Sequence, residues 1–80
     1  MDKPQIVSPL PGVFYRSSSP DQPAYVEVGD TISEGTVIGL VEVMKSFHEV
    51  RADAGGVIAE FLVENEDPVM AGQPLITLEG

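Results

Sequence analysis

The sequence predicts an all-β domain, a flattened β-barrel or sandwich, and three observations lead to this fold class. Eight glycines and seven prolines are spread along the 80 residues, so few segments that lack both residue types are long enough to form a helix. Val, Ile, Phe and Tyr are concentrated in short runs that turn residues separate. The two halves of the chain also repeat one pattern, which predicts a quasi-two-fold domain.

The short runs predict the strands in chain order. Each is rich in β-branched or aromatic residues and is followed by turn chemistry such as Val28-Gly29-Asp30 or Ala54-Gly55-Gly56. Six strands are expected, at Gln5–Val7, Gly12–Tyr15, Val37–Met44, Phe47–Arg51, Gly56–Val63 and Pro74–Leu78.

The internal repeat is visible when residues 27–42 are placed over residues 64–79, an offset of 37 residues. Each half reads as an acidic turn, a β-branched residue, a turn glycine and a strand. Upstream, Gly12-Val13 matches Gly56-Val57 at an offset of 44, so the first half carries about seven extra residues. These fall in Arg16–Pro23, a stretch whose Ser, Pro and Asp content is typical of a surface loop.

The repeat also predicts the interior and two special turns. Gly35 and Gly72 occupy equivalent turns, and both are expected to need a positive φ. The expected core residues are Val13, Ile32, Ile38, Val41, Val57, Val69, Leu75 and Leu78.

Charge and composition exclude several function classes. Four Lys+Arg against thirteen Asp+Glu give a net charge of −9, which argues against binding nucleic acid or an anionic membrane surface. The chain has no cysteine and one histidine, His48, so no disulfide and no metal site is expected. The chain lacks an apolar run of spanning length, and its first four residues lack the features of a signal peptide. We therefore expect a soluble, cytoplasmic domain.

The segment between the two halves contains a lysine that stands apart. Strand-like residues lead up to Val43–Phe47 and away from it, so we expect a hairpin with its tip at Met44-Lys45. The only other lysine is Lys3. A catalytic amine usually needs burial, which a hairpin tip does not offer, so no catalytic residue is expected. The sequence leaves two interpretations, a solvated turn lysine or an amine that another enzyme modifies.

Glu42-Val43-Met44-Lys45 resembles the attachment motif of biotinyl domains of the biotin carboxyl carrier family. In that family a Met-Lys pair stands on a hairpin between two quasi-symmetric halves. Val43 replaces the usual alanine and Ser46 replaces the usual second methionine. Ser8–Arg16 is similar to the first strand region of acetyl-CoA carboxylase carriers, and Ser19-Pro20-Asp21 looks like the start of their protruding thumb loop.

The resemblance covers essentially the whole chain. It implies one biotinyl domain over residues 1–80 with two quasi-symmetric four-stranded sheets. It also implies a thumb at about residues 17–23, with polar side chains that hold the cofactor near the domain surface. Those side chains are expected to be Ser17, Ser18, Ser19 and Gln22.

The resemblance also implies a function and a set of site residues. Lys45 is expected to carry covalent biotin. A biotin protein ligase would attach it, a biotin carboxylase would load it, and a carboxyltransferase would pass the carboxyl group to an acyl-CoA. That acyl-CoA is expected to be acetyl-CoA, in fatty acid biosynthesis, and the carrier itself is not catalytic. The other expected cofactor-binding residues are Met44, Ser46, Glu42, Ser19, Pro20 and Asp21.

Two alternatives remain open from the sequence. A lipoyl carrier of a 2-oxoacid dehydrogenase or glycine-cleavage type system shares the fold and the hairpin. Ser46 fits that class better than a methionine would, whereas Met44 and the thumb fit the biotin class. A β-sandwich interaction module that carries no cofactor would not explain the combination of central lysine, repeat and thumb.

Overall fold

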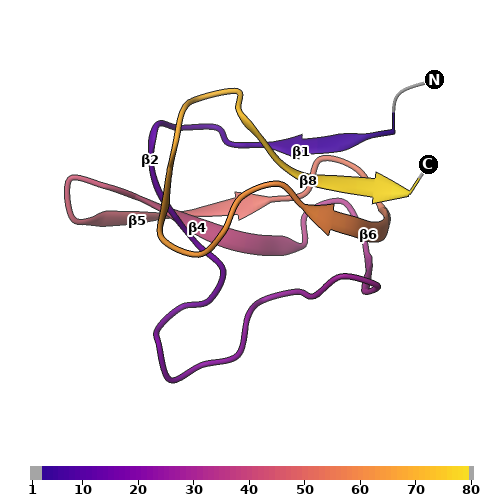
Figure 1. Cartoon of the computed structure of the whole chain (residues 1–80), viewed down its shortest axis with the longest axis horizontal. Helices are drawn as coiled ribbons and strands as arrows, with labels where there is room; N and C mark the ends of the chain where they lie inside the picture. Colours follow the sequence, from indigo (N-terminus) through magenta and orange to yellow (C-terminus); the bar gives the residue numbers. More distant parts are fainter. Residues whose placement is uncertain (1–2, 80) are drawn as a thin grey trace.

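The structure, a computed structural model, describes residues 3–79, and every regular element in that range is a strand (Figure 1). The strands form two antiparallel four-stranded sheets, in the orders β1-β8-β6-β3 and β5-β4-β2-β7. The predicted all-β sandwich is therefore confirmed. The elements are β1 (Gln5–Val7), β2 (Gly12–Tyr15), β3 (Thr31–Ile32), β4 (Val37–Val43), β5 (Ser46–Arg51), β6 (Gly56–Phe61), β7 (Asp67–Val69) and β8 (Pro74–Glu79).

All six predicted strands are present, with ends that differ by at most two residues. The sequence prediction missed β3 and β7. β3 has only two residues, and β7 contains Asp67 and Pro68, which are residue types typical of turns. They nevertheless form the outermost strand at one edge of each sheet, because β3 pairs with β6 and β7 pairs with β2.

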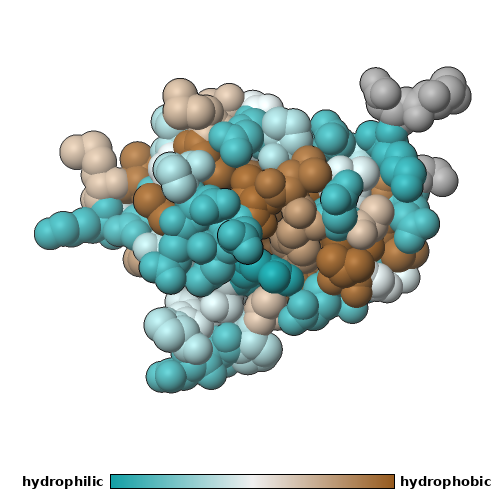
Figure 2. All heavy atoms as spheres, viewed as in Figure 1, coloured by the Kyte–Doolittle hydropathy of each residue, from teal (hydrophilic) through white to brown (hydrophobic). Residues whose placement is uncertain are grey.

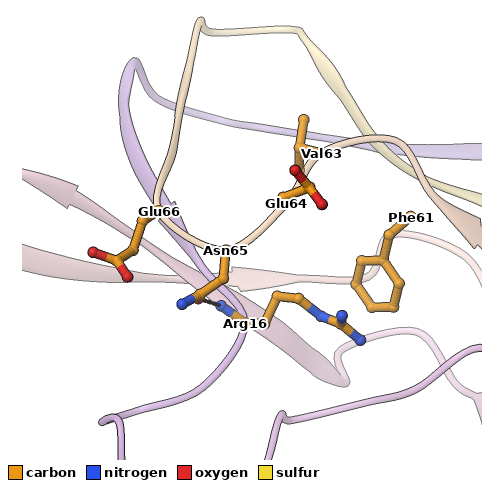
Figure 3. A pocket seen from close by; sticks show the side chains of 6 residues that line it. All are labelled: Arg16, Phe61, Val63, Glu64, Asn65 and Glu66. Atoms are coloured by element: carbon orange, nitrogen blue, oxygen red, sulfur yellow. Dashed lines mark hydrogen bonds between the residues drawn. The ribbon is translucent and has the colours of Figure 1, made fainter.

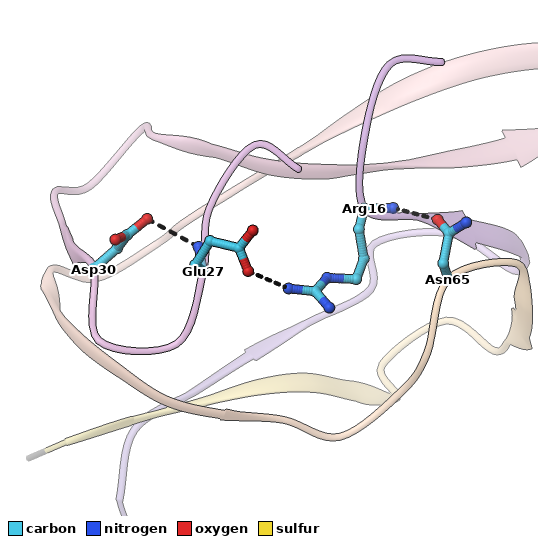
Figure 4. Close-up of polar contacts among 4 residues, drawn as sticks. All are labelled: Arg16, Glu27, Asp30 and Asn65. Carbon is cyan, nitrogen blue, oxygen red and sulfur yellow. Dashed lines mark hydrogen bonds and ion pairs between the residues drawn. The ribbon is translucent and has the colours of Figure 1, made fainter. Parts of the chain in front are cut away.

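The two halves are related by an approximate two-fold axis. Exchanging β1–β4 with β5–β8 converts the order of one sheet into that of the other. The acidic turns repeat the symmetry in detail. The Asp30 carboxylate accepts a hydrogen bond from the Glu27 N–H at 2.9 Å (Figure 4), and Asp67 accepts from the Glu64 N–H at 2.8 Å. Each carboxylate closes its own turn, which explains why both halves keep an aspartate there.

The turns at Gly35 and Gly72 also correspond. Their φ angles are 92° and 82°, as the repeat predicts. The Gly35 N–H donates to the carbonyl of Ala52 and the Gly72 N–H donates to that of Ser8, both at 2.7 Å. Glycine adopts this left-handed conformation without steric cost, so the residue type follows from the turn.

The core lies between the two sheets. Six of the eight predicted core residues are buried, but Val13 and Val57 are only half-buried. Their neighbours Phe14 and Ile58 point inward instead and are fully buried. Successive strand residues face opposite sides of a sheet, so the repeat located equivalent positions correctly but assigned the wrong member of each pair to the interior. The largest fully buried side chains are Phe14, Ile6, Ile38, Ile58, Leu75, Ile76, Leu78, Val41 and Val50.

The β4–β5 hairpin and the ends of the described chain lie at opposite ends of the molecule (Figure 1). The longest extent is 36 Å. At the end away from the hairpin, β1 pairs with β8, and the Leu78 N–H donates to the Pro4 carbonyl at 2.8 Å. Within residues 3–79 there is no helix with the length and apolar character of a membrane span.

One loop leaves the body between β2 and β3 (Figure 1). The Tyr25 N–H donates to the Arg16 carbonyl at 2.8 Å, so residues 17–24 lie outside this closure; we call them the projecting loop. Inside it, the Gln22 N–H donates to the Ser19 carbonyl at 3.1 Å. In Figure 2 the loop is mainly hydrophilic, whereas apolar residues form a band across the body. It contains the extra residues that the repeat comparison located.

Candidate functional site

The tip of the β4–β5 hairpin is a two-residue turn. Val43 pairs with Ser46, and the residues between them, Met44 and Lys45, have φ angles of 49° and 69°. Positive φ at both central positions is what a type I′ turn requires. Neither residue is the glycine or asparagine that this turn favours, so each costs about 1 kcal/mol or more. The tip predicted from the flanking strands is confirmed.

The hairpin presents the Lys45 side chain to solvent. Lys45 and Ser46 are exposed, and Met44 is 93% exposed. Among the described residues the ion pairs are Arg16–Glu27 and Arg51–Glu49, so no carboxylate pairs with the Lys45 amine. The tight turn therefore fixes the backbone that carries the amine while leaving the amine itself accessible.

An aromatic cluster lies on the face of the sheet beside this hairpin. The Tyr15 hydroxyl donates to Glu42 Oε1 at 3.0 Å, and the Tyr15 and Phe47 rings have centroids 5.8 Å apart. Glu42 and Phe47 are cross-strand partners. The hydrogen bond to Glu42, followed by desolvation, raises the pKa of Tyr15. Glu42 was expected near the cofactor, and in the structure its carboxylate holds Tyr15 in place.

A pocket of about 370 Å³ separates the projecting loop from this aromatic cluster. Ser19 and Pro20, two of the predicted site residues, line it, whereas Asp21 does not. Met44 and Ser46 stand at the hairpin tip and are not among its lining residues. The pocket is lined by Tyr15, Ser17, Ser18, Ser19, Pro20, Phe47, Asn65 and Glu66.

A second hollow, of about 590 Å³, shares Asn65 and Glu66 with the first pocket and is also lined by Arg16, Phe61, Val63 and Glu64 (Figure 3). Here the Arg16 guanidinium stacks over the Phe61 ring at 3.9 Å from its centroid, a cation–π contact. It also pairs with Glu27 at 3.2 Å (Figure 4). The charge of Arg16 is therefore matched on the side away from the hairpin.

Sequence reasoning did not select four of the residues that line the first pocket. Tyr15 and Phe47 read only as strand residues, and Asn65 and Glu66 only as turn residues. One available signal was the repeat itself, because Glu66 aligns with Gly29 of the first half. A glutamate where the symmetric turn has glycine is a departure from the repeat.

The sequence is similar to that of several curated proteins. Residues 4–78 match the biotin/lipoyl family that is described as "Biotin-requiring enzyme". The biotin carboxyl carrier protein of acetyl-CoA carboxylase from Chlamydia trachomatis is 49% identical over 73 residues, which are 91% of this chain and 44% of that protein. The protein of the same name from Streptococcus pyogenes is 46% identical over 74 residues, 92% of this chain and 45% of that protein. The chain thus spans less than half of these relatives.

Solved structures share the fold. The crystal structure of Kluyveromyces lactis urea carboxylase superposes with a TM-score of 0.77 at 25% identity, over 99% of this chain and 6% of that one. An aspartoacylase family protein from Mesorhizobium loti gives a TM-score of 0.66 at 23% identity, over 92% of this chain and 22% of that one. With the match over residues 4–78, two symmetric sheets and a lysine at the central hairpin, the chain belongs to the biotin/lipoyl family of biotin-requiring enzymes.

Proposed function

We propose that this chain is a biotin carboxyl carrier domain and that the Lys45 amine bears covalent biotin. The observation that carries the proposal is the placement of one exposed lysine, with no ion-pair partner among residues 3–79, at the tip of a tight hairpin that joins two symmetric halves. The names of the relatives support the biotin assignment over the lipoyl alternative.

The chemistry of attachment places few demands on the carrier. A biotin protein ligase activates the biotin carboxyl group as an acyl-adenylate. The Lys45 Nζ attacks the carboxyl carbon, an amide bond forms, AMP leaves and Nζ loses a proton. The carrier contributes position, because the fixed turn at Met44 and Lys45 presents one amine in a defined direction. No residue of the chain is assigned a catalytic role.

The pocket beside the hairpin fits the chemistry of biotin. Phe47, two residues from Lys45, and Tyr15 offer an apolar surface for the ring system and chain of the cofactor. Ser18 and Ser19 offer hydroxyl groups to the polar ureido ring, whereas the Ser17 hydroxyl donates to the Ser19 carbonyl at 2.9 Å and has only its acceptor capacity to offer. On this basis the projecting loop acts as the thumb that the sequence predicts. Bound biotin supplies a ureido nitrogen that takes up a carboxyl group.

The partners follow from the same proposal. A biotin carboxylase loads the domain with ATP and bicarbonate, and a carboxyltransferase unloads it onto acetyl-CoA for fatty acid biosynthesis. Because this pathway consumes ATP and acyl-CoA, we place the carrier in the cytoplasm. Met44, at 93% exposure, is an adaptable apolar contact for the ligase or for these enzymes.

Lys45→Arg tests the attachment site. The exposed charge is retained, so the variant should fold normally and yet accept no biotin, because a guanidinium does not replace the attacking amine. The domain is treated with biotin protein ligase, ATP and biotin, and the product is followed by streptavidin blotting and intact mass. Lys3→Arg is the matched control, since Lys3 is the only other lysine, and it should be labelled fully. Undiminished labelling of Lys45→Arg would refute the assignment.

A further inference from the structure

We propose that the Asn65–Glu66 turn recognises the ureido ring of biotin, with the Asn65 amide donating to the ureido oxygen and the Glu66 carboxylate accepting from a ureido N–H. The inference rests on the proposed attachment of biotin to Lys45. It adds the turn opposite the projecting loop to the polar recognition by the serine hydroxyls, since both segments line the same pocket.

The turn is held firmly before any ligand arrives. The Arg16 N–H donates to Asn65 Oδ1 at 2.8 Å (Figure 4), which fixes the orientation of the amide. With its oxygen engaged, the amide has its two N–H donors left to offer to a ligand. The Glu66 N–H donates to the Phe14 carbonyl at 2.6 Å, which anchors the turn to β2. A ligand therefore meets an amide whose orientation is already set and a carboxylate carried by an anchored backbone.

The side chains around the Asn65–Glu66 turn point in different directions, and the Glu66 carboxylate is directed away from the Arg16 guanidinium. Figure 3 shows the Arg16 guanidinium extending toward Phe61 and the Glu66 carboxylate extending to the opposite side of the turn. Glu64, two residues earlier, lies on the Phe61 side. Glu66 is close enough to Tyr15 for its charge to contribute to the raised pKa of that hydroxyl. The Glu66 carboxylate thus belongs to the environment of the aromatic cluster beside the hairpin.

The chemistry of the ureido group matches this pair. A ureido ring has one carbonyl acceptor flanked by two N–H donors, and an amide beside a carboxylate offers the complementary donor and acceptor. Tyr15 and Phe47 supply the apolar contact for the rest of the cofactor. Hydrogen bonds to a charged acceptor are stronger than those between neutral groups, so Glu66 should contribute most of the polar recognition.

The charge of the pocket adds selectivity. Glu66 is the only charged side chain among the described lining residues, and the Arg16 charge is matched by Glu27 in the other hollow. The Glu42 carboxylate, which accepts from Tyr15, adds a second negative charge nearby. The pocket therefore favours a ring whose nitrogens carry hydrogen and disfavours one whose nitrogen carries an anionic carboxyl group.

The backbone of Glu66 supports a role for its side chain. Its φ is 68°, a left-handed conformation that is unfavourable for a residue with a Cβ. The symmetric position in the first half is Gly29, with φ 95°. Glycine would satisfy the turn in both halves, so the structure gives no folding reason for a glutamate at this position.

The experiment uses the domain biotinylated at Lys45 with biotin that is ¹⁵N-labelled in the ureido ring. NMR measures the exchange of the ureido N–H protons with water and the mobility of the ring. In the parent domain the slower-exchanging N–H should be protected roughly tenfold relative to free biotin, the size expected for one hydrogen bond to a charged acceptor. Glu66→Ala should abolish this protection while keeping the Cβ and the strained φ.

Two further variants separate recognition from folding. Glu64→Ala makes the same change two residues away on the other side of the turn, and it should retain full protection. Asn65→Asp keeps the oxygen that accepts from the Arg16 N–H but removes the amide donors, and it should increase ring mobility. Equal protection in Glu66→Ala and Glu64→Ala, or an unprotected ring in the parent domain, would overturn the inference.

Charge selectivity is tested after loading. When biotin carboxylase, ATP and bicarbonate have loaded the parent domain, the ring should become more mobile. In Glu66→Gln, which keeps an acceptor without the charge, the increase should be smaller; an equal increase would contradict the electrostatic part. A parent domain that shows no biotin increment by intact mass would contradict the proposed function instead, so the two failures are distinguishable.

Discussion

At the scale of the residue, backbone conformation distinguishes the site. Met44, Lys45 and Glu66 are the non-glycine residues with positive φ among residues 3–79, and all three belong to the hairpin tip or to the pocket beside it. Strained backbone of this kind persists where the surrounding structure enforces it, and it concentrates at functional sites. The sequence motif located Lys45, whereas the signal for Glu66 was its alignment with Gly29, which does not show that its turn lines the pocket.

Met44→Asp tests the choice between biotin and lipoate. The residue before the lysine is where the two carrier classes differ, and aspartate tolerates the positive φ of this turn. The variant should fold, lose biotinylation and gain modification by a lipoyl ligase. Parallel assays with both ligases, read by intact mass, give the result. Ready lipoylation of the parent domain, together with poor biotinylation, would favour the lipoyl alternative that Ser46 leaves open.

Tyr15 gives the stability a dependence on alkaline pH. Its pKa is raised above the ordinary value of 10.0, chiefly by the hydrogen bond to Glu42, so the folded state favours the protonated hydroxyl. The stabilising contribution is complete below pH 10 and is lost as the pH rises through the raised pKa. Denaturant unfolding of Tyr15→Phe should therefore show a shallower decline above pH 10 than the parent domain. Tyr25→Phe is the control and should keep the parent's decline.

At the scale of the element, the positions of the strands along the chain were largely predictable, whereas the side chains that each strand turns toward the core were not. Periodicity and turn residues located β4, β5 and β8 to within a residue or so at each end. The inward face of β2 was assigned wrongly, because the burial of Phe14 in place of Val13 depends on which face of the sheet packs against the other sheet, and a four-residue strand does not reveal this. The pocket was beyond sequence reasoning for a similar reason, since it joins residues from three separate segments.

Deletion of residues 17–23 tests the projecting loop. The fold should survive, because the closure between Arg16 and Tyr25 lies outside the deleted segment and the second half makes the same connection without these residues. Shortening a loop changes its closure entropy by only about 0.6 kcal/mol per halving of length. The variant should still be biotinylated at Lys45 but should show faster ring motion and slower carboxyl transfer. Unchanged motion and turnover would reduce the segment to an ordinary surface loop.

At the scale of the whole molecule, the net negative charge should influence how fast the domain associates with its partner enzymes. The net charge is −9, and electrostatic steering by such an excess accelerates association with basic docking faces. The rate at which biotin carboxylase loads the free domain should fall as potassium chloride is raised, because added ions screen this attraction. Sucrose at matched osmolality should not reproduce the decline. A rate that does not respond to salt would exclude steering.

The approximate two-fold axis has a consequence for how the chain is connected. The symmetry places the gap between β8 and β1 where the β4–β5 hairpin lies in the other half. The two halves therefore have two equivalent junctions, which we call corners. At one corner the chain is continuous through the β4–β5 hairpin, and at the other, the opened corner, the described chain begins and ends. The intact corner bears Lys45, and the opened corner holds Pro4 and Leu78 within hydrogen-bonding distance. Any chain attached at the opened corner would meet the body far from Lys45, so the length of the domain would separate that chain from the lysine that we propose to be biotinylated.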